Sequence, residues 1–415
     1  MKRCKWVLSL LLTAVMAASL LVPSAASAPK KDMYPVVFVH GLAGFGEEAG
    51  AGLALPPWGM AAGNTKKYLN KRGYECYVVS VGPISSAWDR ACELYAQLAG
   101  TRVDYGVAHS AAHGHKRFGK TFKKPLVPGW DSGRKLHLVG HSFGGVTARL
   151  LAQWLEHGNA DERAATPANE LSPLFGETLG GRVASITTFA APHNGSTAVE
   201  PTVGSGERLE KYLIAAGAAG TILPVVNWAY PFGLEHFGIS SKDFYRAPWK
   251  ALDTFRVFDK SADRADTDLS IDGAAALNKA IQCLPGVYYF SYYGQMTRDD
   301  GKGGQAPKDS ISPLMRRIAR EMGERRDPFR TAWGILVDNS WLPNDGLVNV
   351  ISGKYPFTEP YRAYDPDNLR AGVWQVMPMV EYDHIDFWGG LRIGGAPGYH
   401  AFCLAHMAIL EQIPQ

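Results

Sequence analysis

Short apolar runs that end in glycine or a turn alternate along this chain with stretches of helical periodicity. Runs of strand length cover residues 34–41, 75–82, 135–140, 183–191, 287–293 and 373–379. Apolar residues recur at helical spacing in residues 89–98, 144–155, 273–281 and 401–411, and another helix is expected between the first two strands. This alternation predicts an α/β fold with a mainly parallel sheet and helices on both faces.

Two segments do not follow the alternation. Residues 100–131 are rich in histidine, glycine and basic residues, and residues 200–270 contain long apolar stretches. We expect both to be insertions on a single domain that spans residues 29–415, because the sequence contains no internal repeat and no low-complexity linker.

The N-terminus has the layout of a secretory signal peptide. A basic stretch (residues 1–5) precedes an apolar run (6–22) and a small-residue segment that ends at Ala28. We expect residues 1–28 to be removed, with cleavage near Ala26 or Ala28, and the protein to be secreted to the extracellular space. No later apolar run reaches the ~20 residues of a spanning helix, which predicts a soluble mature protein without a transmembrane segment.

Charge and cysteine content narrow the function classes further. The chain has 43 basic and 39 acidic residues, well interspersed, so no basic stripe suggests a nucleic-acid partner. Outside the signal, four cysteines remain, which are Cys76, Cys92, Cys283 and Cys403. Their wide spacing and apolar surroundings make free thiols at least as reasonable as bridges, and no disulfide pairing is predicted.

A candidate nucleophile lies in Gly140-His141-Ser142-Phe143-Gly144. This G-x-S-x-G pattern follows an apolar strand and precedes an apolar helical face, which is the context of a nucleophile elbow that exposes the serine Oγ. The alternative is a glycine-rich turn in which Ser142 only caps the helix.

A serine hydroxyl needs a histidine base that is oriented by a carboxylate. In α/β-hydrolases the acid and then the histidine follow the serine along the chain, which favours His384 after the last strand and Asp345 in the turn Asn344-Asp345-Gly346. Asp338 and Asp365 compete as the acid, Asp383 is a candidate for an outer charge, and Asn-Asp-Gly is also an ordinary turn sequence.

Two backbone N–H groups are candidates for the oxyanion hole. One belongs to Phe143, directly after the serine, and the other to Leu42, in the glycine turn after the first strand. We expect His40, His137 and His141 to be packed, hydrogen-bonded supports and not proton carriers.

Several blocks together resemble the thermoalkalophilic bacterial lipases. They are residues 38–46, 82–93, 103–106, 190–195 and 344–346, and the resemblance extends from about residue 34 to the C-terminus. It implies an α/β-hydrolase fold and a secreted triacylglycerol lipase that acts on acylglycerols at an oil–water interface. The implied triad is Ser142, Asp345 and His384, as deduced above, and we expect a monomer.

The same resemblance implies a zinc-binding subdomain. The family's two aspartates and two histidines fall on Asp89, His109, His115 and Asp263, a neutral and closed ligand set that predicts a structural Zn²⁺. His113 is the alternate ligand. Without the resemblance, the three histidines in residues 109–115 are equally compatible with a polar surface loop.

This chain departs from the family at two positions. Asp386 lies where a calcium ligand is usual, but Leu391 and Arg392 replace the acidic ligand and the proline that follow, so Ca²⁺ binding is doubtful. Phe143 replaces a common glutamine, which alters pocket polarity and leaves the backbone donor intact.

The apolar run 211–232 corresponds to the family's helical lid, which would cover an apolar site in water and open at a lipid surface. A buried helix is the alternative. Within the hydrolase class, a phospholipase A1-type enzyme and a short-chain carboxylesterase remain open. Other classes are a non-catalytic lipid-binding module and an enzyme whose His/Asp cluster is a catalytic metal centre.

Overall fold

The computed structural model describes residues 30–49, 55–203, 233–238 and 260–414. The signal peptide expected over residues 1–28 and the lid expected over residues 211–232 therefore lie outside the described residues. The insertion expected over residues 200–270 is described only in part.

A seven-stranded parallel sheet forms the centre of the fold, in the order β12-β13-β7-β6-β5-β1-β2. Six of these strands coincide with the predicted ones. The strands are β1 Val36–Val39, β2 Cys76–Val78, β5 Leu136–His141, β6 Val183–Phe189, β7 Tyr288–Tyr292, β12 Tyr361–Ala363 and β13 Trp374–Val376. The prediction missed β12, whose three residues lie at the sheet edge and are largely exposed.

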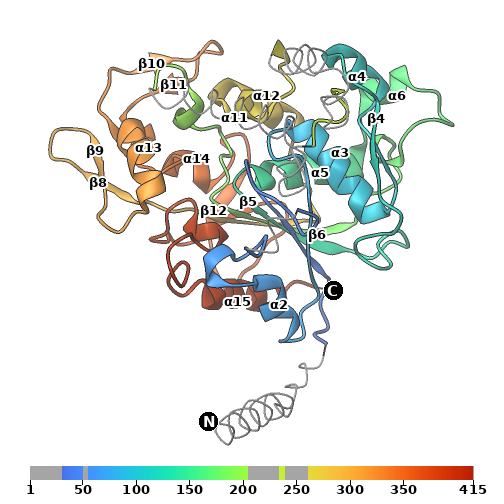
Figure 1. Cartoon of the computed structure of the whole chain (residues 1–415), viewed down its shortest axis with the longest axis horizontal. Coiled ribbons are helices and arrows are strands. Elements are labelled where there is room, and N and C mark those ends of the chain that lie inside the picture. The colour runs from blue at the N-terminus through green and yellow to red at the C-terminus, as the bar shows by residue number, and fades with distance from the viewer. Residues whose placement is uncertain (1–29, 50–54, 204–232, 239–259, 415) are drawn as a thin grey trace, which may run out of the picture.

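Helices cover both faces of the sheet, as predicted (Figure 1). Strand β1 shows the reason, since Val37 and Val39 pack into one apolar cluster while Val36 and Phe38 pack into the other. The first cluster includes residues of α3 Ala87–Ala99, α5 Phe143–His157 and α11 Ala265–Leu269, and Leu277 of α12 Ile271–Ala280 packs against it. The second cluster includes residues of α2 Thr65–Asn70 and α15 Tyr399–Leu410.

Smaller elements surround these layers. The insertion at residues 100–131 folds as β3 Arg102–Asp104, α4 Val107–His113 and β4 Phe118–Thr121, with β3 and β4 paired antiparallel. Among the described residues, the further helices are α6 Ala160–Ala165, α13 Pro313–Gly323 and α14 Val350–Lys354, with 3-10 turns η2 Met60–Ala62, η3 Pro173–Phe175, η4 Thr197–Val199, η5 Asn339–Trp341 and η6 Asp386–Trp388. Two further antiparallel hairpins pair β8 Thr297–Asp299 with β9 Gln305–Pro307 and β10 Phe329–Arg330 with β11 Leu336–Val337.

The parallel arrangement determines where a site can form. The carboxyl ends of parallel strands meet at one edge of a sheet, so the turns after β1 and β5 are brought together there.

Cys76, Cys92, Cys283 and Cys403 are free thiols. Among the described helices, none combines the length and the apolar content that a bilayer crossing requires.

Candidate active site and metal centre

Ser142 lies in a strained turn between β5 and α5. Its backbone has φ 54° and ψ −128°, a conformation that L-residues rarely adopt. The Ser142 N–H donates a hydrogen bond to the Phe189 carbonyl at 2.8 Å, and helix α5 begins at the next residue. This is the strand–turn–helix geometry that the sequence motif predicts for a nucleophile elbow.

Glycines around the turn allow an approach that no side chain would permit. A Cβ on Gly144 would lie 2.1 Å from the Val39 carbonyl oxygen, and a Cβ on Gly41 would lie 2.6 Å from the Cβ of Ser142. The turn after β1 therefore packs directly against the serine because both positions lack a side chain.

His384 and Asp345 form a buried pair. The imidazole Nδ1 lies 3.0 Å from Asp345 Oδ2, and the His384 N–H donates to the Asp345 carbonyl at 3.0 Å. Asp345 Oδ1 accepts from the N–H groups of Leu347 and Val348 at 2.9 and 2.7 Å. Because Nδ1 faces the carboxylate, Nε2 is the nitrogen left to exchange a proton with a nucleophile.

His141 connects this pair to the serine turn. Its Nε2–H donates to the His384 carbonyl at 2.9 Å, and the two rings lie 4.9 Å apart. Burial, followed by the nearby His384 ring, holds the pKa of His141 well below its ordinary value, so His141 stays neutral. His141 is thus a buried support, as expected. Because His141 directly precedes Ser142, its hydrogen bond to His384 connects the histidine to the serine turn.

The competing residues lie elsewhere. Asp338 caps η5, and Asp365 pairs with Arg362 at 3.4 Å. The Asp383 carboxylate accepts from the backbone N–H groups of Ser312 at 2.8 Å and of Ile385 and Asp386 at 3.0 Å, so backbone donors occupy both of its oxygens. Among the candidate acids, only Asp345 is brought to His384 in the part of the chain that the structure describes.

The two residues proposed as oxyanion donors are Leu42, which lines a pocket with Ser142, and Phe143, which follows Ser142 in the chain. Leu42 and Ser142 line one small pocket with apolar neighbours that include Pro192, Ala198 and Leu269. Phe143 is fully buried at the first turn of α5, so its side chain packs into the core and leaves its N–H at the helix start.

Four predicted metal ligands converge from separate segments. One ligand atom from each of Asp89, His109, His115 and Asp263 lies within 4.8 Å of the others. His109 Nε2 is 3.4 Å from Asp89 Oδ1 and 3.2 Å from Asp263 Oδ2, and His115 Nε2 is also 3.2 Å from Asp263 Oδ2. In a tetrahedral zinc site with bonds of about 2.0–2.1 Å, ligand atoms lie roughly 3.3 Å apart.

Unpaired polar atoms also fit a cation at this cluster. Among the described residues, the buried atoms Asp89 Oδ1 and His115 Nε2 form no well-oriented hydrogen bond, although polar atoms of His109 and Asp263 lie 3.4 and 3.2 Å away. Two buried carboxylates that face each other repel unless a positive charge lies between them. Of the two alternatives, His115 belongs to the cluster, and His113 only packs its ring 4.5 Å from that of His109.

His236 lies next to this cluster and was not predicted from the sequence. His236 is not one of the four predicted ligands, but its Nε2 donates to Asp89 Oδ2 at 2.7 Å and so orients the Asp89 carboxylate. The two residues are far apart in the chain, and a lone histidine in residues 233–238 has no spacing to its partners that would reveal it.

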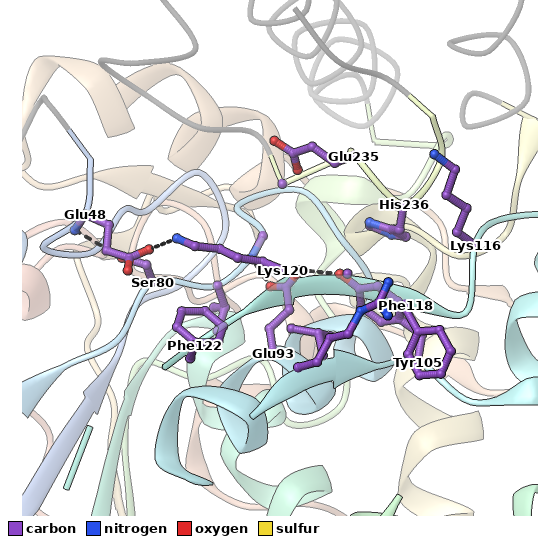
Figure 2. Close-up of a pocket in the computed structure, with 16 residues that line it drawn as sticks. Glu48, Ser80, Glu93, Tyr105, Lys116, Phe118, Lys120, Phe122, Glu235 and His236 are labelled. Atoms are coloured by element: carbon purple, nitrogen blue, oxygen red, sulfur yellow. Dashed lines mark hydrogen bonds and ion pairs between the residues drawn. The ribbon is translucent and has the colours of Figure 1, made fainter. Parts of the chain in front are cut away.

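Next to the cluster is a cavity of about 590 Å³ (Figure 2). Its lining includes Glu93, Tyr105, Lys120 and His236, so it adjoins the candidate metal centre through His236. Burial raises the pKa of Glu93 to about 7.

The candidate calcium position holds a different cation. The Arg392 guanidinium lies 2.5 Å from Asp386 Oδ2, and Asp386 is buried. The positive charge that calcium would supply is already present as a side chain. An arginine paired with Asp386 is unfavourable for a cation ligated as in the family. The weakened Ca²⁺ binding expected from the sequence stays a prediction.

The fold is a parallel sheet flanked by helices on both faces. It carries a serine elbow after a central strand and a buried His–Asp pair. These features are those of the α/β-hydrolase class. Residues 32–393 match the family described as "Lipase-like, C-terminal domain". The chain belongs to this family, and the resemblance to bacterial lipases is confirmed.

Individual relatives agree with this assignment. Lipase 2 of Staphylococcus aureus and a lipase of Staphylococcus epidermidis each share 36% sequence identity with this chain. Each match covers 86% of this chain and 50% of the relative. This chain therefore spans about half the length of those relatives. The crystal structure of Staphylococcus hyicus lipase has a TM-score of 0.83 at 33% identity, covering 94% of this chain and 98% of that one. Lipase 1 from Pelosinus fermentans has a TM-score of 0.75 at 32% identity, with 93% and 100% covered.

Proposed function

We propose that this chain is a triacylglycerol lipase that hydrolyses carboxylic ester bonds through an acyl-enzyme on Ser142. The observation that carries the proposal is the buried pair of His384 and Asp345, which His141 joins to the strained serine turn. Membership of a lipase-like family and similarity to bacterial lipases support the acylglycerol substrate.

Each residue has a defined role in the proposed mechanism. Ser142 Oγ attacks the ester carbonyl while His384 Nε2 takes its proton, and Asp345 holds the imidazole in the required tautomer and stabilises its charge. The N–H groups of Leu42 and Phe143 bind the oxyanion. His384 then protonates the departing alcohol, and a water molecule activated by the same imidazole releases the fatty acid.

We infer that Asp89, His109, His115 and Asp263 hold Zn²⁺. The neutral set of two imidazoles and two carboxylates fills a tetrahedral shell and leaves no position for a reacting water, which favours a structural role. Secretion, action at a lipid surface as a monomer, and a single domain over residues 29–415 complete the proposal. The basic and apolar N-terminus supports export.

The test is release of fatty acid from triacylglycerols of graded chain length by the wild type and by Ser142→Ala. We expect the variant to lose hydrolysis and the wild type to accept long chains. Phospholipid and soluble short-chain esters serve as comparison substrates, and a preference for either would move the assignment to a phospholipase A1-type enzyme or a carboxylesterase. Undiminished hydrolysis by Ser142→Ala would remove the proposal.

A further inference from the structure

The Gly41–Leu42 peptide, whose N–H is the proposed oxyanion donor, is fixed by hydrogen bonds on its other side. The Gly41 carbonyl accepts from His40 Nδ1 at 3.0 Å and from the Gly44 N–H at 3.1 Å. The Val81 N–H donates to His40 Nε2 at 3.3 Å, so Nδ1 carries the proton. Because a peptide is planar, holding the carbonyl at one end sets the direction of the Leu42 N–H at the other.

Arg90 of α3 holds the same turn from beneath. Its side chain is fully buried, and its guanidinium donates to the carbonyls of His40 and Gly82, the latter at 2.7 Å. The Arg90 Nε donates to Thr147 Oγ1 of helix α5 at 2.9 Å, and the guanidinium lies 5.0 Å from the Phe143 ring. One rigid group therefore joins the turn after β1, the loop after β2 and helix α5, which begins directly after the serine.

Glu93 lies one turn further along α3 and binds the same loop after β2. It contacts the Gly82 N–H, whereas Arg90 contacts the Gly82 carbonyl. Its Oε2 accepts from the Gly82 N–H at 2.5 Å, and its Oε1 accepts from the Tyr105 hydroxyl at 3.0 Å. Figure 2 shows Glu93 and Tyr105 among the residues that line the adjacent cavity. The next residue of the loop, Pro83, accepts from the Ala43 N–H at 2.9 Å.

We propose that Arg90 and Glu93 are positioning residues for the oxyanion hole. Together they bind the N–H and the carbonyl of Gly82. Arg90 also donates to the His40 carbonyl, before Leu42, and the loop they hold presents the Pro83 carbonyl to the Ala43 N–H, after Leu42. The role rests on the proposed hydrolase function. It gives residues 82–93 a role beyond the proposed metal ligand Asp89, because helix α3 carries this ligand and also the groups that align the donor.

The matched control is Arg149. This arginine is also buried, but it lies further along α5 and donates to Asn278 Oδ1 at 2.9 Å, away from the turn after β1. Arg90→Met and Arg149→Met remove the same group from equally buried positions. Both variants leave buried acceptors unpaired, so both are expected to lower the melting temperature.

The experiment measures kcat and KM on p-nitrophenyl butyrate, a soluble ester, for wild type, Ser142→Ala, Arg90→Met, Arg90→Lys and Arg149→Met, below the melting temperature of each. A donor displaced by about 1 Å costs on the order of 100-fold in rate. We expect Arg90→Met to lose about that factor in kcat with KM little changed, and to weaken inhibition by butylboronic acid in parallel, since that inhibitor forms a tetrahedral adduct on the serine. Arg90→Lys should recover part of the loss, and Arg149→Met should keep the wild-type kcat.

Equal kcat values for Arg90→Met and Arg149→Met would overturn the positioning role while leaving the hydrolase intact. If Arg90→Met does not fold, Thr147→Val and Glu93→Leu replace it. The first removes the acceptor of the Arg90 Nε–H, and the second removes both acceptors of Glu93. A wild-type kcat in both would overturn the role. Ester hydrolysis that does not depend on Ser142 would instead overturn the proposed function, and the positioning role with it.

Discussion

At the scale of single residues, the tautomer of His384 decides whether the serine has a base. The Asp345 carboxylate faces Nδ1 at 3.0 Å and also accepts two backbone N–H groups, so its orientation is fixed. Asp345→Asn keeps the shape of the side chain but can present an N–H to Nδ1, which favours the wrong tautomer. We expect kcat to fall by about 10⁴ with little change in melting temperature.

The control for this variant is Asp338→Asn, which changes a carboxylate that caps η5 and does not contact the imidazole. Steady-state kinetics on a soluble ester should show wild-type kcat for Asp338→Asn. A kcat in Asp345→Asn close to that of the control would mean that another group orients His384.

Chain order made the triad candidates predictable from sequence, since turns after parallel strands gather at one edge of the sheet. The orienting neighbours were not predictable. His236 and Arg90 act through contacts between segments far apart in the chain, and neither has a local spacing that reveals its partner. Side-chain hydrogen bonds of this kind depend on the packed fold and not on sequence periodicity.

A second prediction at this scale concerns the ion pair of Arg392 and Asp386. Because the guanidinium already neutralises the carboxylate, removal of Ca²⁺ with EGTA should leave both kcat and the melting temperature unchanged. Arg392→Gln leaves the buried Asp386 without its charge partner and should lower the free energy of unfolding by roughly 1–3 kcal/mol. Lys308→Gln, which removes an exposed ion pair with Glu381, serves as the control.

Denaturant unfolding measures the free energy of unfolding of Arg392→Gln and Lys308→Gln, and kcat on a soluble ester and the melting temperature of the wild type are compared with and without EGTA. A loss of activity in EGTA that added Ca²⁺ restores would show that calcium binds despite the arginine.

At the scale of elements, the contact between helix α5 and strand β1 depends on Gly144. A Cβ there would lie 2.1 Å from the Val39 carbonyl, and backbone cannot yield as a flexible side chain does. Gly144→Ala should therefore lower the free energy of unfolding by about 1–3 kcal/mol and displace the serine turn. Gly286→Ala is the matched control, because a Cβ at Gly286 would have no described atom within 4 Å.

Denaturation midpoints and kcat should change together in Gly144→Ala and remain at wild-type values in Gly286→Ala. Equal stability of the two variants would contradict the close packing of the elbow.

Elements with a strong apolar pattern were predictable, and weakly patterned ones were not. Strand β1 is buried on both faces, so its sequence is a continuous apolar run. Strand β12 consists of Tyr361, Arg362 and Ala363 at the sheet edge, and β4 is mostly exposed, so neither shows such a run. Their pairing with neighbouring strands is determined by tertiary contacts that local propensity does not encode.

At the scale of the whole molecule, the candidate metal centre joins segments that are distant in sequence. Asp89 comes from α3, His109 from α4 and Asp263 from the residue pair before α11. An ion bound there would constrain a long stretch of chain, and an ion bound only by the native state adds to the free energy of unfolding. Helix α3 connects the two sites, because it carries both Asp89 of the candidate metal centre and Arg90, which contacts the turn after β1 beside the serine. Loss of the ion should therefore lower stability first, and lower catalysis only as a result of the lost stability.

Metal removal tests this order of events. Dialysis against a strong chelator should lower the melting temperature, and restoring Zn²⁺ at about 1,000 times its Kd should return roughly 4 kcal/mol. His115→Ala should show the lower melting temperature with or without Zn²⁺, whereas His113→Ala should respond to Zn²⁺ as the wild type does, because only His115 belongs to the cluster. Calorimetry gives the melting temperatures, and hydrolysis of a soluble ester, measured well below them, gives the chemistry. If chelation abolished hydrolysis while the protein stayed fully folded, the ion would be catalytic, and the closed ligand set inferred from these four residues would be wrong.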